Sequence, residues 1–317
     1  MHSSPNKQCD LNLIPNLLLK TSFCNYSSYN NIQSLLSTCT FPMHFKQSLV
    51  TPLLKKPSLD KDILNNYRPI SNLSLISKIT ERIVKSRLNE HLLSNSQYNP
   101  NKSAYTKYHS TETTILSLHD QLITGISHQQ VSCLLDLSAA FDTIHYSILL
   151  HRVSSWFGIT DSALTWFKTC LTTRSFSILA SGFASPPYPL SRGILQGSVL
   201  GPILFNMYTT PLSTFISSRS LHHHLYAVDT QIFISIAPKT FTTAITQLQN
   251  TISDISSWMT ANLLSLNLSK TDFMLIGLPQ QISKISNPIS LLSFKSPITP
   301  TDSARNLGFI FDSSLTF

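Results

Sequence analysis

The first clear periodicity along the chain is helical. Apolar residues recur near helical spacing between positions 73 and 92, and Lys78, Arg82 and Lys85 fall largely outside that stripe. This pattern predicts an amphipathic helix with a basic exposed face. The apolar stripe consists of Ile76, Ile79, Ile83, Leu88 and Leu92.

A β-strand is predicted at Val131–Leu137. Apolar residues occupy alternate positions in this segment, and Asp136 falls on the other face together with Ser132 and Leu134. Because side chains of a strand alternate between its two faces, the segment is expected to carry a carboxylate near its end.

Beyond this strand, short strands and helices are mixed without strict alternation. Helices are predicted near residues 149–157, 164–171 and 245–259, a strand at 175–180, and two hairpins at 222–236 and 264–276, the first with its tight turn near Val228–Asp229. This mixture favours an α+β fold in which an antiparallel sheet carries helices on one face.

The composition is that of a globular chain. It has 317 residues, of which 42% are hydrophobic and 12% charged, which excludes a disordered or fibrous chain. The five cysteines are too sparse for a disulfide scaffold or a cysteine-rich zinc site and favour a reducing, intracellular compartment. Apolar runs are too short and interrupted for a membrane span, so no membrane partner is expected. Residues 1–40 show no clear period and are expected to be poorly ordered.

Basic residues concentrate in one stretch of the chain. Between Lys46 and Lys107 there are eleven Lys or Arg and four Asp or Glu, a surplus of +7 within a formal charge of +8. Such a segment suits a polyanion such as nucleic acid. It equally suits a solvated helix face, so charge alone leaves both interpretations open.

Three motifs occur in a fixed order: Leu134–Asp142 (LLDLSAAFD), Gly193–Pro202 (GILQGSVLGP) and Tyr226–Gln231 (YAVDTQ). Together with flanking motifs they resemble the reverse transcriptase domain of non-LTR (LINE-type) retrotransposons, over roughly Phe45 to Phe317. The flanking motifs are Asn66–Ser71, His109–Glu112, Trp258–Met259, Leu266–Thr271 and Ala304–Gly308.

This resemblance implies a right-hand polymerase. The fingers are expected at 41–130 and the palm, an antiparallel sheet packed on helices, at 131–276. Residues 277–317 are expected to hold the end of the palm and the start of a truncated thumb. The family function is RNA-directed DNA synthesis from deoxynucleoside triphosphates on an RNA template and a DNA primer, in the nucleus or cytoplasm. The oligomeric state is not indicated.

The resemblance also implies a site for two Mg²⁺ ions. Asp136 and Asp229 are the expected catalytic carboxylates and metal ligands, since magnesium prefers hard oxygen donors. The family carries Tyr-Ala-Asp-Asp where this chain has Tyr226-Ala-Val-Asp229, so Val228 replaces one metal-binding aspartate. A valine offers no lone pair, and this copy is therefore expected to be catalytically impaired.

Five further residues match nucleotide-binding positions of the family. Phe141 matches the ring that rejects a 2′-hydroxyl, and Arg68 matches the fingers arginine that holds the triphosphate. Gln196 and Gly197 match the template and nucleotide contact, where glycine permits close backbone approach, and Lys270 matches the lysine that assists pyrophosphate departure. A core phenylalanine, a surface arginine and a lysine in a turn remain the alternatives.

Histidine and tryptophan residues suggest no separate site. His222–His224 are consecutive, and since neighbouring strand residues point to opposite faces they cannot close on one ion, so a polar strand is the better interpretation. Trp156, Trp166 and Trp258 lie among apolar neighbours and are predicted to be core residues.

Two rival functions stay open at this point. The first is a non-catalytic nucleic-acid binder that uses the basic segment while its metal ions bind weakly. The second is a decayed element reading frame without a selected role, which a noncooperative thermal transition would indicate.

Overall fold

The computed structural model describes residues 37–138, 144–180, 182–264, 271–285, 291–293 and 296–313. Side chains of residues 135–138, 291–293 and 296–298 lie outside this description. The segment 1–40, expected to be poorly ordered, falls almost entirely outside the described residues.

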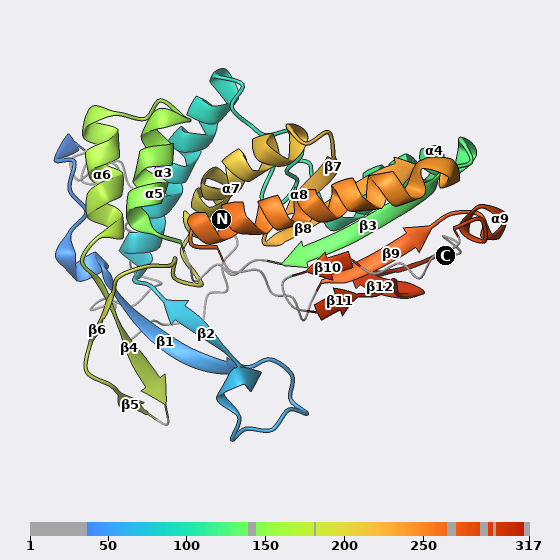
Figure 1. Ribbon diagram of the computed structural model, residues 1–317. Helices are drawn as coiled ribbons and strands as arrows, with labels where there is room; N and C mark the ends of the chain where they lie inside the picture. The colour runs from blue at the N-terminus through green and yellow to red at the C-terminus, as the bar shows by residue number, and fades with distance from the viewer. Residues whose placement is uncertain are drawn as a thin grey trace. The chain divides into compact units, whose positions relative to one another are not determined.

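Helices and strands alternate irregularly along the described chain (Figure 1). The helices are α3 (Leu75–Ser94), α4 (Thr111–Ser127), α5 (Tyr146–Ser155), α6 (Asp161–Leu171), α7 (Gly201–Ser217), α8 (Phe241–Ala261) and α9 (Pro279–Ile282). The strands are β1 (Gln47–Leu54), β2 (Tyr67–Asn72), β3 (Val131–Ser138), β4 (Arg174–Ala180), β5 (Phe183–Ala184), β6 (Tyr188–Leu190), β7 (His222–Tyr226), β8 (Asp229–Ile236), β9 (Asp272–Ile276), β10 (Leu291–Ser293), β11 (Ser296–Ile298), β12 (Ser303–Asn306) and β13 (Phe309–Asp312).

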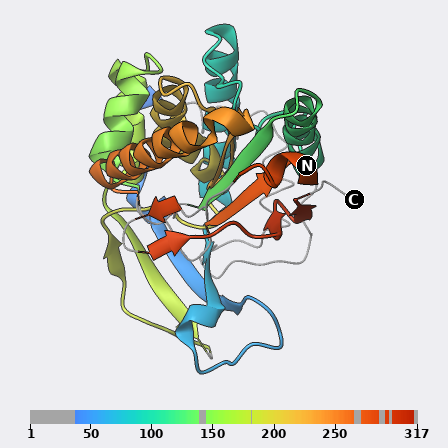
Figure 2. The same cartoon turned by 45° about the vertical axis from the view of Figure 1, so that its right-hand side comes forward.

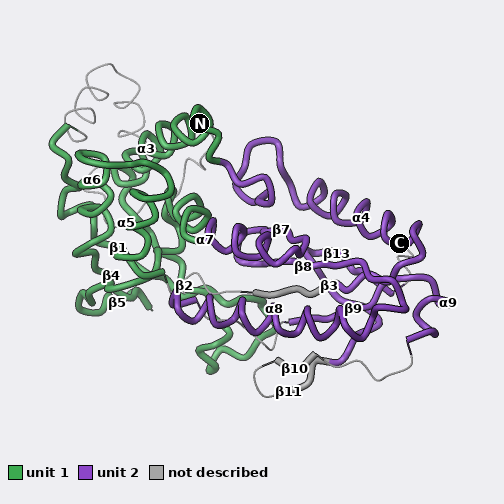
Figure 3. Tube along the Cα trace, turned by 45° about the horizontal axis from the view of Figure 1, so that its top comes forward, with its two compact units in different colours: residues 1–97, 144–208 green, residues 98–143, 209–317 purple. Residues whose placement is uncertain are grey.

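The chain divides into two compact units (Figure 3). Unit 1 comprises residues 1–97 and 144–208, and unit 2 comprises residues 98–143 and 209–317. The sequence suggests fingers and palm as continuous ranges, whereas both units are discontinuous. Unit 1 is discontinuous because its strands pair across the sequence. β4 lies beside β1 although more than a hundred residues separate them.

Unit 1 is built on a five-stranded mixed sheet. β1 pairs antiparallel with β2 and parallel with β4, and β4 pairs antiparallel with β5 and β6. α5 packs against α6, and the rings of Phe41 and Trp166 meet edge to face with centroids 5.7 Å apart. The strand predicted at 175–180 and the helices predicted near 149–157 and 164–171 are confirmed.

Helix α3 confirms the predicted helix but buries a different face. Its N-cap is Ser74, whose side chain accepts a hydrogen bond from the backbone of Ser77. Ile76, Ile79 and Ile83, predicted as part of the buried stripe, are only half-buried. The buried positions are Ser77, Thr80, Glu81, Val84, Leu88 and Leu92. The apolar stripe therefore predicts the wrong buried face for the first half of the helix. There, a hydrogen-bond network around Glu81, described below, takes the place of apolar packing.

Unit 2 is built on a four-stranded antiparallel sheet in the order β7-β8-β3-β9. The predicted strand at Val131–Leu137, the hairpin at 222–236 and the helix near 245–259 are confirmed. β9 pairs with β3, and residues 265–270, which belong to the second predicted hairpin, lie outside the described residues.

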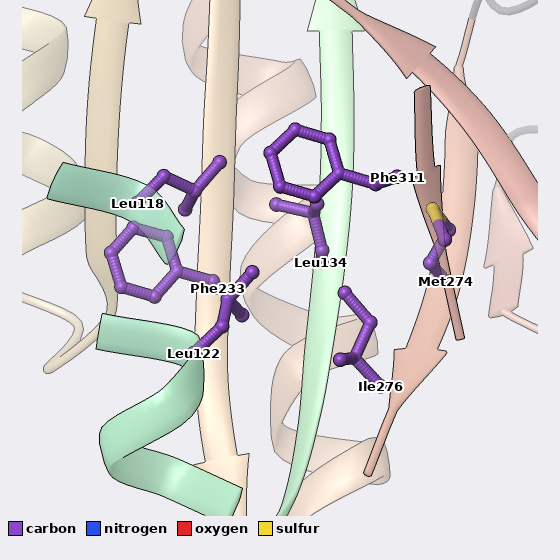
Figure 4. Packing of buried hydrophobic residues seen from close by; sticks show 7 residues of the cluster. All are labelled: Leu118, Leu122, Leu134, Phe233, Met274, Ile276 and Phe311. Carbon is purple, nitrogen blue, oxygen red and sulfur yellow. The ribbon is translucent and has the colours of Figure 1, made fainter. Parts of the chain in front are cut away.

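Helices cover both faces of this sheet. On one face, Leu118 and Leu122 of α4 pack against Leu134, Phe233 and further apolar residues in one buried cluster (Figure 4). α8 lies across the opposite face (Figures 2 and 4). The expectation of helices on one face alone was wrong, because β3 buries apolar side chains in both directions: Val131 and Cys133 are as buried as Leu134.

The three tryptophans differ in burial. Trp166 is buried, as predicted, and Trp258 is half-buried and stacks on Phe215 with ring centroids 6.2 Å apart. Trp156 is 44% exposed, so its assignment to the core was wrong. Helix α5 ends at Ser155, and the chain then turns Phe157 inward in its place. Among the helices that the structure describes, none is both long and apolar enough to cross a membrane.

Candidate functional site

A row of polar residues crosses the sheet of unit 2. In the strand register His224 lies opposite Gln231, Gln231 opposite Asp136, and Asp136 opposite Asp272. Directly opposite residues of antiparallel strands occupy the same face with Cα atoms about 4.5–5.5 Å apart. We call these four positions the polar row. They share their sheet face with the neighbouring apolar row that contains Leu134 and Phe233.

Asp229 stands one step further along the same face. It is the first residue of β8 and lies opposite Ser138, two positions beyond Asp136. Such diagonal neighbours are about 7–8 Å apart. The two expected carboxylate positions therefore belong to adjacent strands and to one face. The side chain of Asp136 lies outside the described residues.

The hairpin turn between β7 and β8 consists of Ala227 and Val228, since Tyr226 pairs with Asp229. The turn therefore lies one residue earlier than predicted. Ala227 has φ 54°, a conformation that normally favours glycine at the first central position of a two-residue turn. The backbone strain of the turn is thus carried by Ala227, and half-buried Val228 has a negative φ.

Two members of the polar row were missed by the sequence analysis as site residues. Asp272 brings a second carboxylate directly opposite Asp136, and Gln231 is fully buried. The Gln231 amide nitrogen donates to Oδ1 of Asn306 at 2.9 Å. Gln231 Oε1 and Asn306 Nδ2 are buried and have no hydrogen-bond partner among the described residues. No local sequence signal identified them, because their meeting depends on strand register.

The histidine triplet has three different environments. His223 is buried on the other face and lies 2.6 Å from Ser213 Oγ, and burial, with smaller effects of the neighbouring histidines, lowers its pKa to about 4. His222 stacks on Phe233. His224 is half-buried, its Nε2 has no partner among the described residues, and burial lowers its pKa.

Unit 1 brings Gln196, Gly197 and β2 together. The backbone N–H of Ser71 in β2 donates to the carbonyl of Gln196 at 2.7 Å. Gly197 has φ +120°, and a Cβ there would collide with the carbonyl oxygen of Ser71, so glycine is required at this position. Gln196 and Gly197 are exposed, as is Arg68, three residues before Ser71 on the same strand. We call residues 194–200 the 194–200 loop.

A buried carboxylate holds the other end of this loop. Glu81 of α3 is 0% exposed. Its Oε2 accepts from Ser198 Oγ at 2.8 Å, from the Val199 N–H at 2.7 Å and from the Leu200 N–H at 3.3 Å. Its Oε1 accepts from Arg174 Nη2 at 3.1 Å. In the sequence Glu81 is only one charge among others, because nothing in the local pattern distinguishes it from a surface glutamate.

The basic segment is divided between the units and partly buried. Lys46 is buried in unit 1 and donates to Thr173 Oγ1 at 2.8 Å, and Lys102 is buried in unit 2 and donates to Thr209 Oγ1 at 2.5 Å. These two lysines stabilise the fold rather than offering charge to a partner. Lys55, Lys56 and Lys61 are exposed on the connection between β1 and β2, so this connection offers three accessible positive charges.

Two expected site residues cannot be placed. Phe141 and Lys270 lie outside the described residues. Among the side chains that the structure does describe, no group of three or more His, Cys, Asp or Glu could hold a metal ion. The side chain of Asp136 is not among these described side chains.

Solved structures share this fold, which is that of a right-hand polymerase. Apo telomerase from Candida tropicalis superimposes on 92% of this chain and 59% of its own, with a TM-score of 0.57 at 12% identity. A second telomerase structure from the same organism has a TM-score of 0.56 at 11% identity, and the match covers 92% of this chain and 53% of the telomerase chain.

The chain belongs to the reverse transcriptase (RNA-dependent DNA polymerase) family, whose pattern matches residues 54–311. It is 25% identical over 291 residues to a probable RNA-directed DNA polymerase from transposon BS of Drosophila melanogaster, covering 90% of this chain and 31% of the relative. The corresponding protein of mobile element jockey from Drosophila funebris is 26% identical over 298 residues, with 90% and 31% covered. The resemblance to non-LTR retrotransposon reverse transcriptases is confirmed, and the chain spans about a third of the length of these curated relatives.

Proposed function

We propose that this chain is the polymerase domain of a retroelement protein and extends a DNA primer on an RNA template. The observation that supports this most directly is the strand register, which puts Asp136 and Asp229 on one face of adjacent antiparallel strands. Family membership supplies the reaction class. The reaction is attack of the primer 3′-hydroxyl on the α-phosphorus of a deoxynucleoside triphosphate, which forms a phosphodiester bond and releases pyrophosphate.

Asp136, Asp229 and Asp272 are the proposed metal ligands. Their positions fit a divalent metal because the adjoining Gln231 adds a fully buried oxygen without a partner among the described residues, and Mg²⁺ prefers such hard oxygen donors. Two Mg²⁺ ions, when bound, stabilise the attacking and the leaving oxygens of the displacement. In this proposal Asp272 partly compensates for the aspartate that Val228 replaces, and activity is reduced rather than abolished.

The nucleotide contacts are proposed for residues of unit 1 and for the family-matched positions. Exposed Arg68 binds the triphosphate through its planar, multi-donor guanidinium. Gln196 and Gly197 contact the template and the nucleotide, and the absence of a side chain at Gly197 permits close approach. Phe141 as the ring that excludes a 2′-hydroxyl and Lys270 as the group near the leaving pyrophosphate rest on the family resemblance.

Primer extension with the purified chain tests this function. The wild type, Val228→Asp and Asp136→Asn are compared on an RNA template with a DNA primer, in Mg²⁺ and in Mn²⁺. We expect slow extension by the wild type and at least about tenfold faster extension by Val228→Asp, equivalent to about 1.4 kcal/mol of transition-state stabilisation. Asp136→Asn should be inactive. Failure of both the wild type and Val228→Asp to extend the primer would refute the proposal, and robust wild-type synthesis would refute the impairment.

Nucleic-acid binding without catalysis has separate support from the exposed Lys55, Lys56 and Lys61. Phosphate contacts make affinity fall with salt, so a titration of RNA–DNA hybrid binding between low and high salt measures this contribution. Binding that is intact in Asp136→Asn while no variant extends a primer would favour the non-catalytic function. The proposed site of action is the nucleus or cytoplasm, where the templates of such elements occur.

A further inference from the structure

Glu81 has no part in the reaction as proposed, yet among the described residues of unit 1 it is the only buried carboxylate. We propose that Glu81 is a positioning residue: it holds the 194–200 loop so that Gln196 and Gly197 are correctly placed for template and nucleotide. This inference rests on the proposed polymerase function and adds a residue outside the three signature motifs.

The bonding pattern assigns each oxygen of Glu81 a separate task. Oε2 accepts from Ser198 Oγ and from the backbone N–H groups of Val199 and Leu200, at 2.7–3.3 Å. Oε1 accepts from Arg174. The Ser198 hydroxyl is also reached by the N–H of Gly201, at 3.1 Å. One carboxylate therefore fixes three consecutive residues immediately before α7.

The charge of Glu81 suits this place. The residues it binds lead directly into the N-terminus of the 17-residue helix α7, where unpaired backbone N–H groups favour a negative charge. Arg174 is itself held, because its Nε donates to the Cys170 carbonyl at 2.5 Å and its Nη2 lies 3.0 Å from Cys170 Sγ. Burial alone would lower the pKa of Arg174, but Cys170 and Glu81 outweigh it and keep the guanidinium charged.

The loop is held at both ends by one continuous segment. Ser71 of β2 binds the carbonyl of Gln196, and Glu81 of α3 binds Val199 and Leu200. β2 and α3 are separated only by residues 73 and 74, and β2 also carries Arg68. Placement of Gln196 and Gly197 relative to Arg68 is thus fixed by the length of this segment and by the Glu81 carboxylate.

Removal of the Glu81 charge should therefore affect the loop more than the rest of unit 1. Glu81→Gln preserves size but replaces one accepting oxygen with an amide that only donates, so it cannot satisfy both Arg174 and the loop. Glu81→Asp keeps the charge and shortens the reach. Glu90→Gln, on the same helix but exposed, is the matched control.

Amide hydrogen exchange of the full chain is the first measurement and requires no catalytic activity. We expect at least tenfold faster exchange at Val199 and Leu200 in Glu81→Gln, a smaller increase in Glu81→Asp, and wild-type exchange in Glu90→Gln. Helices α5 and α6 should keep their wild-type exchange. Unchanged loop exchange would overturn the proposal, and so would a uniform increase across unit 1, since that would make Glu81 a general stability residue. If Glu81→Gln does not fold, Glu81→Asp decides by the same criterion.

Steady-state extension is the second measurement, in the Val228→Asp background. A positioning role predicts that KM for the deoxynucleotide rises at least fivefold in Glu81→Gln while kcat changes less than twofold, with no change in Glu90→Gln. A fall in kcat at constant KM, or no change in either constant, would overturn the nucleotide role even with a loosened loop. If neither the wild type nor Val228→Asp extends a primer, the polymerase function fails and the nucleotide role fails with it, whereas hydrogen exchange still decides whether Glu81 holds the loop.

Discussion

In unit 1 the buried carboxylate of Glu81 has hydrogen-bond donors on both oxygens, whereas in unit 2 the buried atoms Gln231 Oε1 and Asn306 Nδ2 have no partner among the described residues. Both sets are polar and removed from solvent. A satisfied network stabilises one backbone arrangement, and an unsatisfied buried polar group costs free energy unless a ligand or ion completes it.

This difference matches the two roles that we propose for these regions. The network around Glu81 joins α3, β4 and the segment before α7 and fixes a loop. The polar row of unit 2 ends at Asp272 and includes the expected metal ligand Asp136, so its incomplete bonding suits a place where ions bind. The variants below test whether the two regions really differ in this way, from the largest expected effect to the smallest.

The strongest test removes the partner of the buried carboxylate. Arg174→Met leaves Glu81 buried without its counter-ion, and breaking a buried pair in this way costs about 3–5 kcal/mol. Arg219→Met is the control, because Arg219 and Asp254 form an exposed pair with 43% and 45% of their side chains accessible, worth about 0–1 kcal/mol. Unfolding in urea measures both. Equal losses of unfolding free energy in the two variants would show that the buried Glu81–Arg174 pair stabilises the fold no more than the exposed pair does.

Acid should act on unit 2 through His223. Its pKa is lowered to about 4 in the folded chain from a usual 6.5, so the unfolded chain binds the proton more readily. Neutral His223 therefore contributes about 3 kcal/mol to the free energy of unfolding. This contribution is fully present above pH 6.5 and is lost as the pH falls toward 4. His223→Gln should flatten this pH dependence of unfolding, and His222→Gln, the exposed neighbour, should retain it. A wild-type slope in His223→Gln would contradict the assignment.

Asp272 should contribute to metal binding. Electron paramagnetic resonance of free Mn²⁺ gives the dissociation constant without catalysis. We expect Asp272→Asn to weaken Mn²⁺ binding about tenfold, or 1.4 kcal/mol, because it removes a charged oxygen ligand opposite Asp136. Asp254 of the same unit has a side chain that is 45% accessible, and Asp254→Asn should bind Mn²⁺ like the wild type. Identical affinities in the two variants would remove Asp272 from the proposed site.

The smallest effect is expected of a double variant that replaces Gln231 and its hydrogen-bond partner Asn306. Gln231→Leu alone or Asn306→Leu alone leaves the other buried amide unpaired, at a cost of about 1–3 kcal/mol. The double variant removes both amides and should unfold within about 1 kcal/mol of the wild type. A double variant less stable than either single one would mean that this pair stabilises the fold as the Glu81 network does.

Local pattern predicted the elements that form the palm sheet. Alternation in Val131–Leu137 predicted β3 and put Asp136 on the face opposite Cys133, and the apolar pattern around His222–Ile236 predicted the β7–β8 hairpin. These predictions succeed because strand period and turn residues are read within a few positions. The turn itself lies one residue earlier than predicted, because Tyr226 pairs with Asp229 and leaves Ala227 and Val228 between the strands.

Residues whose role depends on distant partners could not be predicted in the same way. In the sequence Glu81 does not differ from other charged helix residues, and only the fold brings Arg174 and the 194–200 loop into contact with it. Asp272 is a candidate site residue only because it lies opposite Asp136 in the strand register. The prediction that Trp156 is a core residue was wrong for a related reason. Helix α5 ends at Ser155, and Phe157 rather than Trp156 then turns inward.

The sequence by itself determined the family, the order of the motifs and the presence of a valine at position 228, because these are properties of residue identity and short spacing. Only the tertiary structure decided that residues 144–208 complete the sheet begun by β1, that Glu81 is buried, and that Asp272 stands beside Asp136. The physical reason is that burial and strand register depend on contacts between segments up to more than a hundred residues apart, and no local pattern encodes them.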